Sequence, residues 1–165
     1  MTLFRPLATL LLLVVAACAT SAPDRETQPA PVAYYVMRHL QKAEGPDPLL
    51  SAEGMENARR LSRFFTADPP RAIYVSSTRR ASETAVPLSA ALSLPAHVYD
   101  PADTPGLIAR VKKEAGPVLI VGHSNTVPEI VAGLGGARPA DLAETDYGDI
   151  FRVRRDGSVE RLRLE

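Results

Sequence analysis

The stretch Val32-Ala33-Tyr34-Tyr35-Val36-Met37-Arg38-His39 decides the fold of this chain. Its apolar, aromatic and β-branched residues predict a buried strand, and the turn-prone residues 41–46 follow soon after. Ligand sites of α/β sheets lie at the carboxyl ends of the strands. An arginine and a histidine at such an end offer a fixed cation beside a group that binds, attacks or moves protons. The pair alone is more often an exposed strand end, so the rest of the chain must decide.

Helical and strand patterns alternate after this stretch. Further strands are expected at residues 72–75, 98–99 and 117–121, and a closing hairpin at residues 150–154 and 159–164, turned at Asp156-Gly157. Helices are expected from the N-cap Ser51 to the stop at Pro69-Pro70, then up to about residue 92 with a possible kink at Pro87, and at residues 106–115 and 128–134. The alternation predicts an α/β three-layer sandwich: a mainly parallel central sheet, helices on both faces and an antiparallel C-terminal edge hairpin.

The composition narrows the function classes. The chain has 165 residues, enough for one core, and its 19 basic and 19 acidic residues cancel, which argues against a nucleic-acid partner. It has no tryptophan and few other aromatic residues on which bases could stack. One cysteine and three histidines cannot build a Cys-rich zinc site. We therefore expect chemistry without a metal or another cofactor.

The first residues are typical of a secretory signal. Arg5 supplies a positive charge, and residues 7–17 are almost all apolar, a run too short to span a bilayer comfortably. The sequence Val15-Ala16-Ala17-Cys18 resembles the lipobox of bacterial lipoproteins, in which the cysteine is lipidated after cleavage. The resemblance implies a signal peptide at residues 1–17 and lipidation at Cys18. An ordinary cleaved signal with an incidental cysteine is the alternative.

A polar, proline-containing segment separates the anchor from the predicted domain. Residues 18–31 hold Pro23, Pro29 and Pro31 without helical or strand periodicity, which is typical of a flexible tether. The domain would then occupy residues 32–165. Ala19 stands where retained inner-membrane lipoproteins tend to have aspartate. We expect a lipoprotein of the bacterial cell envelope that faces the periplasm and contacts the membrane through its lipid anchor. Ala19 favours the outer membrane.

Three predicted strands end in polar groups. Arg38-His39 follows the first strand, Ser76 to Arg80 the second and Gly122-His123-Ser124 the fourth. The carboxyl ends of parallel strands share one edge of a sheet, so these groups should surround one crevice. Clustered cations repel unless an anion lies among them. A phosphoryl group fits, because arginine forks match its geometry and helix N-termini present N–H groups to it.

These motifs resemble the histidine phosphatase superfamily, also called the phosphoglycerate mutase-like fold. The matching residues are Arg38-His39, Arg80-Ala81-Ser82-Glu83-Thr84 and Gly122-His123-Ser124, in the family's order. The resemblance implies that His39 is the nucleophile and that Arg38, Arg80 and His123 bind phosphate. Arg80 fits better than Arg79, because the family's arginine directly precedes the Ala-x-x-Thr that opens the helix.

The resemblance also implies a mechanism of two displacements. Neutral His39 attacks phosphorus to give a phosphohistidine, which water then hydrolyses. The three phosphate-binding residues offset the charge in both steps. His123 is expected to work better when protonated. The substrate would be a small phosphorylated molecule or a phosphoprotein, carrying a phosphomonoester or a phosphoramidate.

The chain departs from the family in two places. Leu40-Gln41 stands where members more often have a small residue and then glutamate, and Leu40 is expected to crowd the phosphate. The acid that protonates the leaving group is also unclear. Asp100 lies nearest the family's usual position, with Asp103 and Glu44 as rivals, and Asp100 alternatively just opens a turn. A weak acid would favour phosphoramidates and other substrates with good leaving groups.

Two other functions compete with that of a phosphatase: an α/β-hydrolase and a binding or scaffolding module. Residues 122–126 come close to a Gly-x-Ser-x-Gly elbow, but no histidine follows Ser124, as an α/β-hydrolase requires. His97 is expected to be exposed or structural. The serious rival is a lipid-anchored module that binds a phosphorylated ligand, or serves as a scaffold, without turnover. Specificity would come from residues 41–50, 100–105 and 137–149.

Overall fold

A single six-stranded sheet organises the protein. The computed structural model describes residues 32–164; the predicted signal peptide, Cys18 and the whole of the predicted tether lie outside the described residues. The elements, in chain order, are β1 (Ala33–Arg38), α1 (Ala52–Phe64), β2 (Ala72–Ser76), α2 (Arg79–Leu92), β3 (Ala96–Tyr99), α3 (Thr104–Val111), β4 (Val118–Gly122), α4 (Val127–Gly133), β5 (Asp149–Arg154) and β6 (Val159–Arg163). They include every strand and helix that the sequence predicts.

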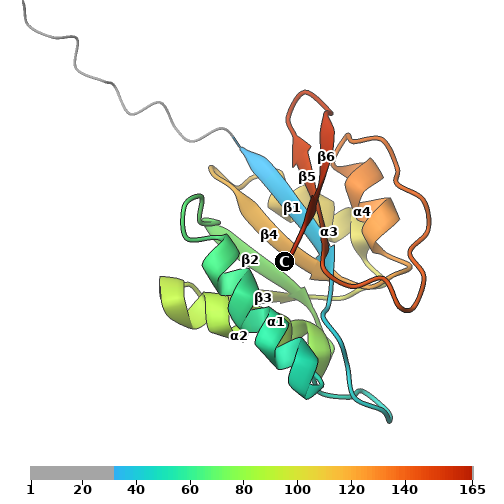
Figure 1. Cartoon of the computed structure of the whole chain (residues 1–165). Coiled ribbons are helices and arrows are strands. Elements are labelled where there is room, and N and C mark those ends of the chain that lie inside the picture. Colours follow the sequence, from blue (N-terminus) through green and yellow to red (C-terminus); the bar gives the residue numbers. More distant parts are fainter. Residues whose placement is uncertain (1–31, 165) are drawn as a thin grey trace, which may run out of the picture.

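The order of the strands is β3-β2-β4-β1-β5-β6. The first three neighbouring pairs are parallel, while β5 runs antiparallel to β1 and β6 antiparallel to β5. Figure 1 shows β1 and β4 side by side in the middle of the sheet, with the β5–β6 hairpin to one side. The predicted mainly parallel sheet with an antiparallel C-terminal edge hairpin is confirmed.

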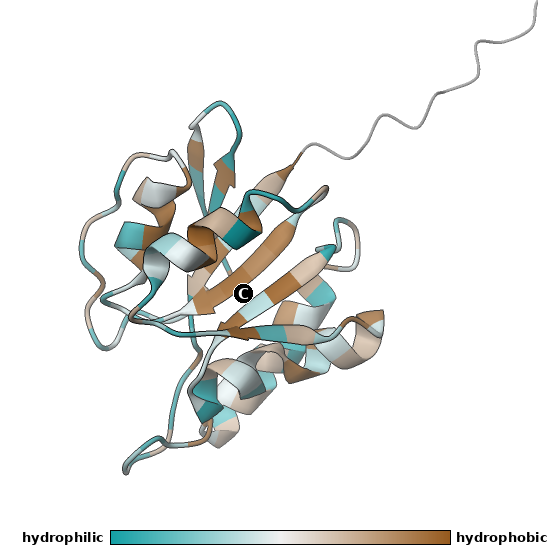
Figure 2. Ribbon diagram, turned by 180° about the vertical axis from the view of Figure 1, so that it is seen from behind, coloured by the Kyte–Doolittle hydropathy of each residue, from teal (hydrophilic) through white to brown (hydrophobic). Residues whose placement is uncertain are grey.

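Two apolar cores cover the two faces of the sheet, because successive strand residues point to opposite sides. Tyr35 and Met37 of β1 join one core, which packs under α1 and α2. Tyr34 and Val36 join the other, which packs under α3 and α4. Figure 2 shows apolar strands between helices whose outer faces are more polar. The three predicted layers are therefore present.

The helix after β3 differs from the prediction. It was expected at residues 106–115, and α3 instead spans Thr104–Val111. It starts earlier because the Asp103 carboxylate accepts a hydrogen bond from the Gly106 N–H and caps the first turn. It ends earlier because the N–H groups of Lys113 and Glu114 bond three residues back, in tight turns. α2 runs through Pro87 as one helix.

The described residues contain no helix that is long and apolar enough to cross a membrane. The same residues hold no group of three or more His, Cys, Asp or Glu side chains arranged for a metal ion.

The start of α1 is fixed to the segment that follows the Arg38-His39 motif. The Ser51 side chain accepts a hydrogen bond from the Gly54 N–H at 3.1 Å, as the predicted N-cap should. Its backbone N–H donates to the Gln41 carbonyl at 2.9 Å. A Cβ atom on Gly54 would lie 2.0 Å from that same carbonyl oxygen. Glycine is therefore required here by close packing between helix and segment.

Gly54→Ala should lower the free energy of unfolding by about 1–3 kcal/mol, because overpacking against backbone outweighs the better helix propensity of alanine. Urea denaturation followed by circular dichroism measures the change. Arg59→Ala, at an exposed position of the same helix, is the matched control and should stay within about 0.5 kcal/mol of the wild-type protein. A Gly54→Ala variant as stable as the wild type would refute the packing argument.

Candidate active site

The register between β1 and β4 brings two of the predicted motifs together. Arg38 pairs with Gly122, so His39 and His123 leave neighbouring strands at the same level. The backbone N–H of His39 donates a hydrogen bond to the Gly122 carbonyl at 2.9 Å, and the ring centres of His39 and His123 are 5.3 Å apart. Both histidines are buried, with exposed fractions of 2% and 9%. The prediction that these two strand ends meet at one edge of the sheet is confirmed.

Hydrogen bonds fix the proton on His39. Nδ1 lies 2.8 Å from the Leu40 carbonyl oxygen, which only accepts, so Nδ1 carries the hydrogen. Nε2 in turn accepts a hydrogen bond from Nε of Arg80 at 3.0 Å. The unprotonated nitrogen of His39 thus faces the arginine that opens α2. A neutral imidazole held in this way offers a lone pair to an electrophile in the site.

The second strand end delivers Arg80 through a capped helix. The hydroxyl of Thr78 accepts from the Ala81 N–H and starts α2, so Arg80 lies in its first turn. Asp47 approaches from the segment after β1: its Oδ1 accepts from the Arg79 N–H at 3.1 Å and lies 3.5 Å from Nη1 of Arg80. The structure therefore brings Arg80, rather than Arg79, to His39, as the motif predicts.

Arg38 is a buried cation, with an exposed fraction of 2%. Its Nη1 donates to the Ala143 carbonyl at 2.8 Å, and its Nη2 donates to the Glu144 carboxylate at 2.7 Å. The Tyr147 ring lies 4.4 Å from the guanidinium carbon, within cation–π range. In the part of the chain that the structure describes, Nε has no hydrogen-bond partner. This buried N–H group of Arg38 is thus not used by its neighbours.

The pKa values of both histidines are depressed. Burial is the main cause for His39, and the charges of Arg38 and Arg80 add to it, so the pKa falls to about 4. Burial and the same two arginines also lower the pKa of His123 to about 4. Both rings are therefore neutral near pH 7 in the unliganded site. The expectation that His123 works protonated does not hold for this state, because the arginines that would bind an anion also repel a proton.

Leu40 does not crowd the site as predicted. Its side chain is fully buried in the core under α1 and α2, and its backbone N–H donates to the Thr84 hydroxyl at 3.0 Å. The bulky Leu40 side chain therefore stabilises the end of β1 from the face of the sheet that α1 and α2 cover. The Gln41 side chain points to the start of α1, where its amide donates a hydrogen bond to Glu53 and accepts one from Asn57. His39 and His123 thus lie side by side despite both departures from the family's pattern.

The candidate acids lie elsewhere. Asp100 accepts a hydrogen bond from the Ala102 N–H, and β3, which it follows, is three strand spacings, or about 14 Å, from β1. Asp103 caps α3. In the described part of the chain neither carboxylate bonds His39 or His123, which agrees with the turn-forming alternative for Asp100. Glu44 is exposed in the segment after β1.

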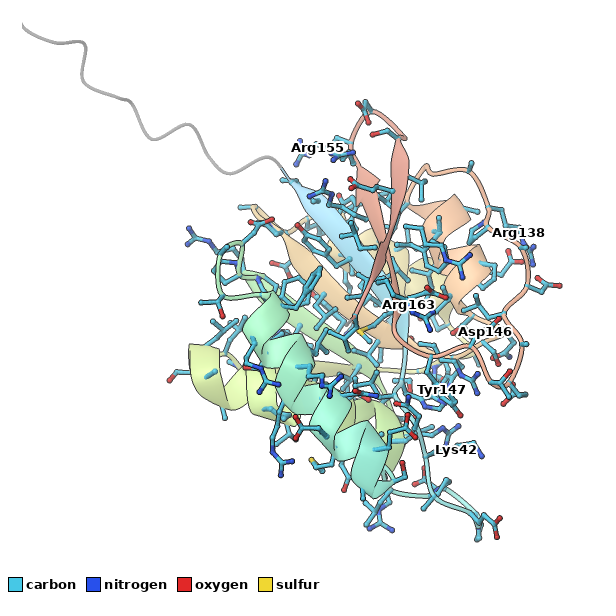
Figure 3. The ribbon with its side chains drawn as sticks, in the orientation of Figure 1. Lys42, Arg138, Asp146, Tyr147, Arg155 and Arg163 are labelled. Atoms are coloured by element: carbon cyan, nitrogen blue, oxygen red, sulfur yellow. The ribbon has the colours of Figure 1, made fainter. Side chains whose placement is uncertain are left out.

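Glu144 and Tyr147 belong to the site, although the sequence did not single them out. Besides its bond to Arg38, the Glu144 carboxylate accepts from the Ser124 hydroxyl at 2.6 Å. The ring centre of Tyr147 is 6.0 Å from that of His39. Figure 3 shows Asp146, Tyr147 and Lys42 at the same end of the molecule, beside the end of β1. They reach the site because β5 runs antiparallel to β1, so the residues that precede β5 fall where β1 ends.

Comparison with known proteins agrees with this geometry. The model of the histidine phosphatase superfamily (branch 1) matches residues 35–101, which include Arg38, His39 and Arg80. A search of the curated proteins finds no match. The matched segment, which is less than half of the chain, contains two of the three motifs on which the resemblance rests.

Solved structures extend the likeness to the whole fold. The protein histidine phosphatase SixA, complexed with tungstate, is 20% identical with a TM-score of 0.61, over 79% of this chain and 94% of that chain. A mycobacterial glucosyl-3-phosphoglycerate phosphatase is 14% identical with a TM-score of 0.64, over 81% and 99%. The structure of a protein described as an α-ribazole-5′-phosphate phosphatase from Escherichia coli is 16% identical with a TM-score of 0.62, over 81% and 96%. At these identities the likeness shows the phosphoglycerate mutase-like fold.

The depressed pKa values predict how stability depends on pH. In the unfolded chain the two histidines take up protons near pH 6.5, whereas in the folded protein they stay neutral down to about pH 4. The unfolded state binds more protons in this range, so the free energy of unfolding should fall as the pH drops from 7 to 5. Urea denaturation at several pH values measures this slope.

His39→Gln should weaken that pH dependence, because one of the two buried groups no longer titrates. His97→Gln is the matched control, since His97 is an exposed histidine outside the site. Identical slopes in the wild type and in the His39→Gln variant would contradict the buried, neutral state of His39.

Proposed function

We propose that this chain, whose residues 35–101 match the histidine phosphatase superfamily, hydrolyses a phosphomonoester or a phosphoramidate through a phosphohistidine on His39. One observation carries the proposal: the unprotonated Nε2 of the buried His39 points at Arg80, beside His123 and the buried Arg38. A nucleophile surrounded by donors and cations suits a phosphoryl group, whose charge grows on its equatorial oxygens during transfer.

In the first step the lone pair on Nε2 of His39 forms a bond to phosphorus, and the bond from phosphorus to the leaving oxygen or nitrogen breaks. The leaving group takes the electron pair and then a proton from solvent water. In the second step a water oxygen forms a bond to phosphorus and its proton passes to solvent, the bond from phosphorus to Nε2 breaks with the electron pair returning to Nε2, and inorganic phosphate leaves. The Leu40 carbonyl keeps the proton on Nδ1 throughout, so Nε2 is regenerated as a nucleophile.

Arg38, Arg80 and His123 hold the phosphoryl oxygens. The Nε group of Arg80, which donates to Nε2 of His39 without substrate, turns its hydrogen bond to a phosphate oxygen and frees the lone pair. Nε of Arg38 supplies a donor that has no other partner. A nearby dianion raises the pKa of His123 from its depressed value, because it offsets the repulsion from the two arginines. His123 then donates a hydrogen bond where negative charge develops.

Within the described residues no carboxylate is hydrogen-bonded to His39 or His123, and this bears on the substrate. A phosphoramidate nitrogen is basic and needs less help to leave than an alkoxide does. Phosphohistidine on a protein is one such substrate, and the similar protein SixA is described as a protein histidine phosphatase. Its complex with tungstate, a tetrahedral oxyanion, is consistent with the binding of a phosphate-like anion by a protein of this fold. Small phosphomonoesters with good leaving groups are also expected to react.

The proposal predicts that the purified protein hydrolyses p-nitrophenyl phosphate with a burst and forms an acid-labile phosphoenzyme. His39→Ala should abolish the labelling and lower turnover at least about a thousandfold, because the nucleophile is lost. His97→Ala, which removes the exposed histidine, is the matched control. Binding of phosphate without turnover over a broad pH range would instead establish the binding module and refute the enzyme.

We also propose that the chain is anchored through a lipid on Cys18 in the bacterial cell envelope, facing the periplasm. The argument is the signal-like residues 1–17 and the tether of residues 18–31. The tether precedes the N-terminal end of β1, whereas the candidate site lies at its C-terminal end. A six-residue strand rises about 20 Å, so an anchor at this position would leave the site open away from the membrane.

Cys18→Ser should release the protein from the membrane fraction or block its processing, because no thiol remains for the lipid. Fractionation of cells and electrophoretic mobility measure both effects. A variant with wild-type mobility that stays in the membrane fraction would rule out lipidation at this residue.

A further inference from the structure

Both arginines of the candidate site already have an acidic partner. Glu144 bonds Arg38 at 2.7 Å, and Asp47 lies 3.5 Å from Arg80. The two carboxylates come from segments on either side of the site, after β1 and before β5. Glu144 is 74% exposed although its partner is buried, so it lies at the rim where a substrate would enter.

Several contacts hold the Glu144 carboxylate in place. One oxygen accepts from Arg38 and the other from the Ser124 hydroxyl, which follows His123. The backbone on either side is fixed as well, because Ala143 and Asp146 close a turn by two hydrogen bonds of 2.8 and 3.0 Å. The carboxylate therefore stays beside the histidine pair through Ser124 even when Arg38 takes another partner.

A phosphate bound by Arg38 uses donors of the same guanidinium, so its oxygens come within a few ångströms of Glu144. The exposed Glu144 carboxylate therefore places a negative charge beside the bound phosphate, next to the part of the substrate that carries it. The charge of Lys42 also acts on Glu144.

We propose that Glu144 is a specificity-determining residue that selects substrates with a cationic nitrogen close to the phosphoryl group and disfavours substrates with a carboxylate there. The assignment rests on the proposed function, because it concerns what the same site accepts. A positive nitrogen near phosphorus pairs with the Glu144 carboxylate, whereas a carboxylate is repelled by it. O-phosphoethanolamine and 3-phosphoglycerate are simple probes of the two classes.

The test compares the wild-type protein with Glu144→Gln, which keeps the shape of the side chain and removes its charge. Calorimetric titration with inorganic phosphate should show about three- to tenfold tighter binding by the variant, the size expected for one partly exposed charge. The ratio of kcat/KM for O-phosphoethanolamine to that for 3-phosphoglycerate should fall by a similar factor. Glu129→Gln, which removes an exposed glutamate paired with Arg138 outside the site, should change neither quantity.

Wild-type affinity of Glu144→Gln for phosphate would overturn the assignment, whatever the turnover. The two proposals fail separately. A protein that binds phosphate more tightly as the variant but does not hydrolyse p-nitrophenyl phosphate refutes the hydrolysis and upholds the role of Glu144. A protein that hydrolyses it with equal phosphate affinity in both forms refutes only the role of Glu144.

Discussion

The burial of one arginine is the constraint on which the site depends. A guanidinium removed from water costs several kcal/mol unless charged and polar partners surround it. Arg38 has an exposed fraction of 2%, and it finds the Glu144 carboxylate, the Ala143 carbonyl and the Tyr147 ring, all from the segment before β5. That segment is therefore held to the end of β1 by the cation. Among the described residues nothing accepts a hydrogen bond from Nε of Arg38, and Nη1 and Nη2 each use one of their two N–H groups in these bonds.

The histidine pair follows from strand register and from the charges nearby. Parallel pairing of Arg38 with Gly122 places His39 and His123 next to each other, and their burial beside two arginines keeps both rings neutral. A neutral imidazole can act as a nucleophile, because one of its ring nitrogens has a free lone pair near pH 7. The same cations that depress the pKa values attract an oxyanion. The neutral histidine pair and the positive charge beside it, on which the proposed phosphoryl transfer depends, thus follow from one electrostatic arrangement.

Much of this could be predicted from local sequence. Apolar runs that end in Arg38-His39 and in Gly122-His123 mark strands whose carboxyl ends share an edge, because parallel strands connected by helices must point the same way. The Thr78 cap and the residues after it place Arg80 in the first turn of α2. The boundaries of α3 were wrong by a few residues, since a cap made by Asp103 and tight final turns depend on local hydrogen bonds that hydrophobic spacing does not encode.

What the sequence did not predict depends on which strands become neighbours. Glu144 and Tyr147 lie more than a hundred residues from Arg38, and they reach it only because β5 pairs with β1 and starts where β1 ends. The prediction that Leu40 crowds the phosphate is wrong for a related reason. Adjacent residues after a strand point in opposite directions, so the Leu40 side chain enters the core while His39 faces the site. The segment before β5 thus reaches the site through tertiary pairing, and its sequence carries no recognisable motif.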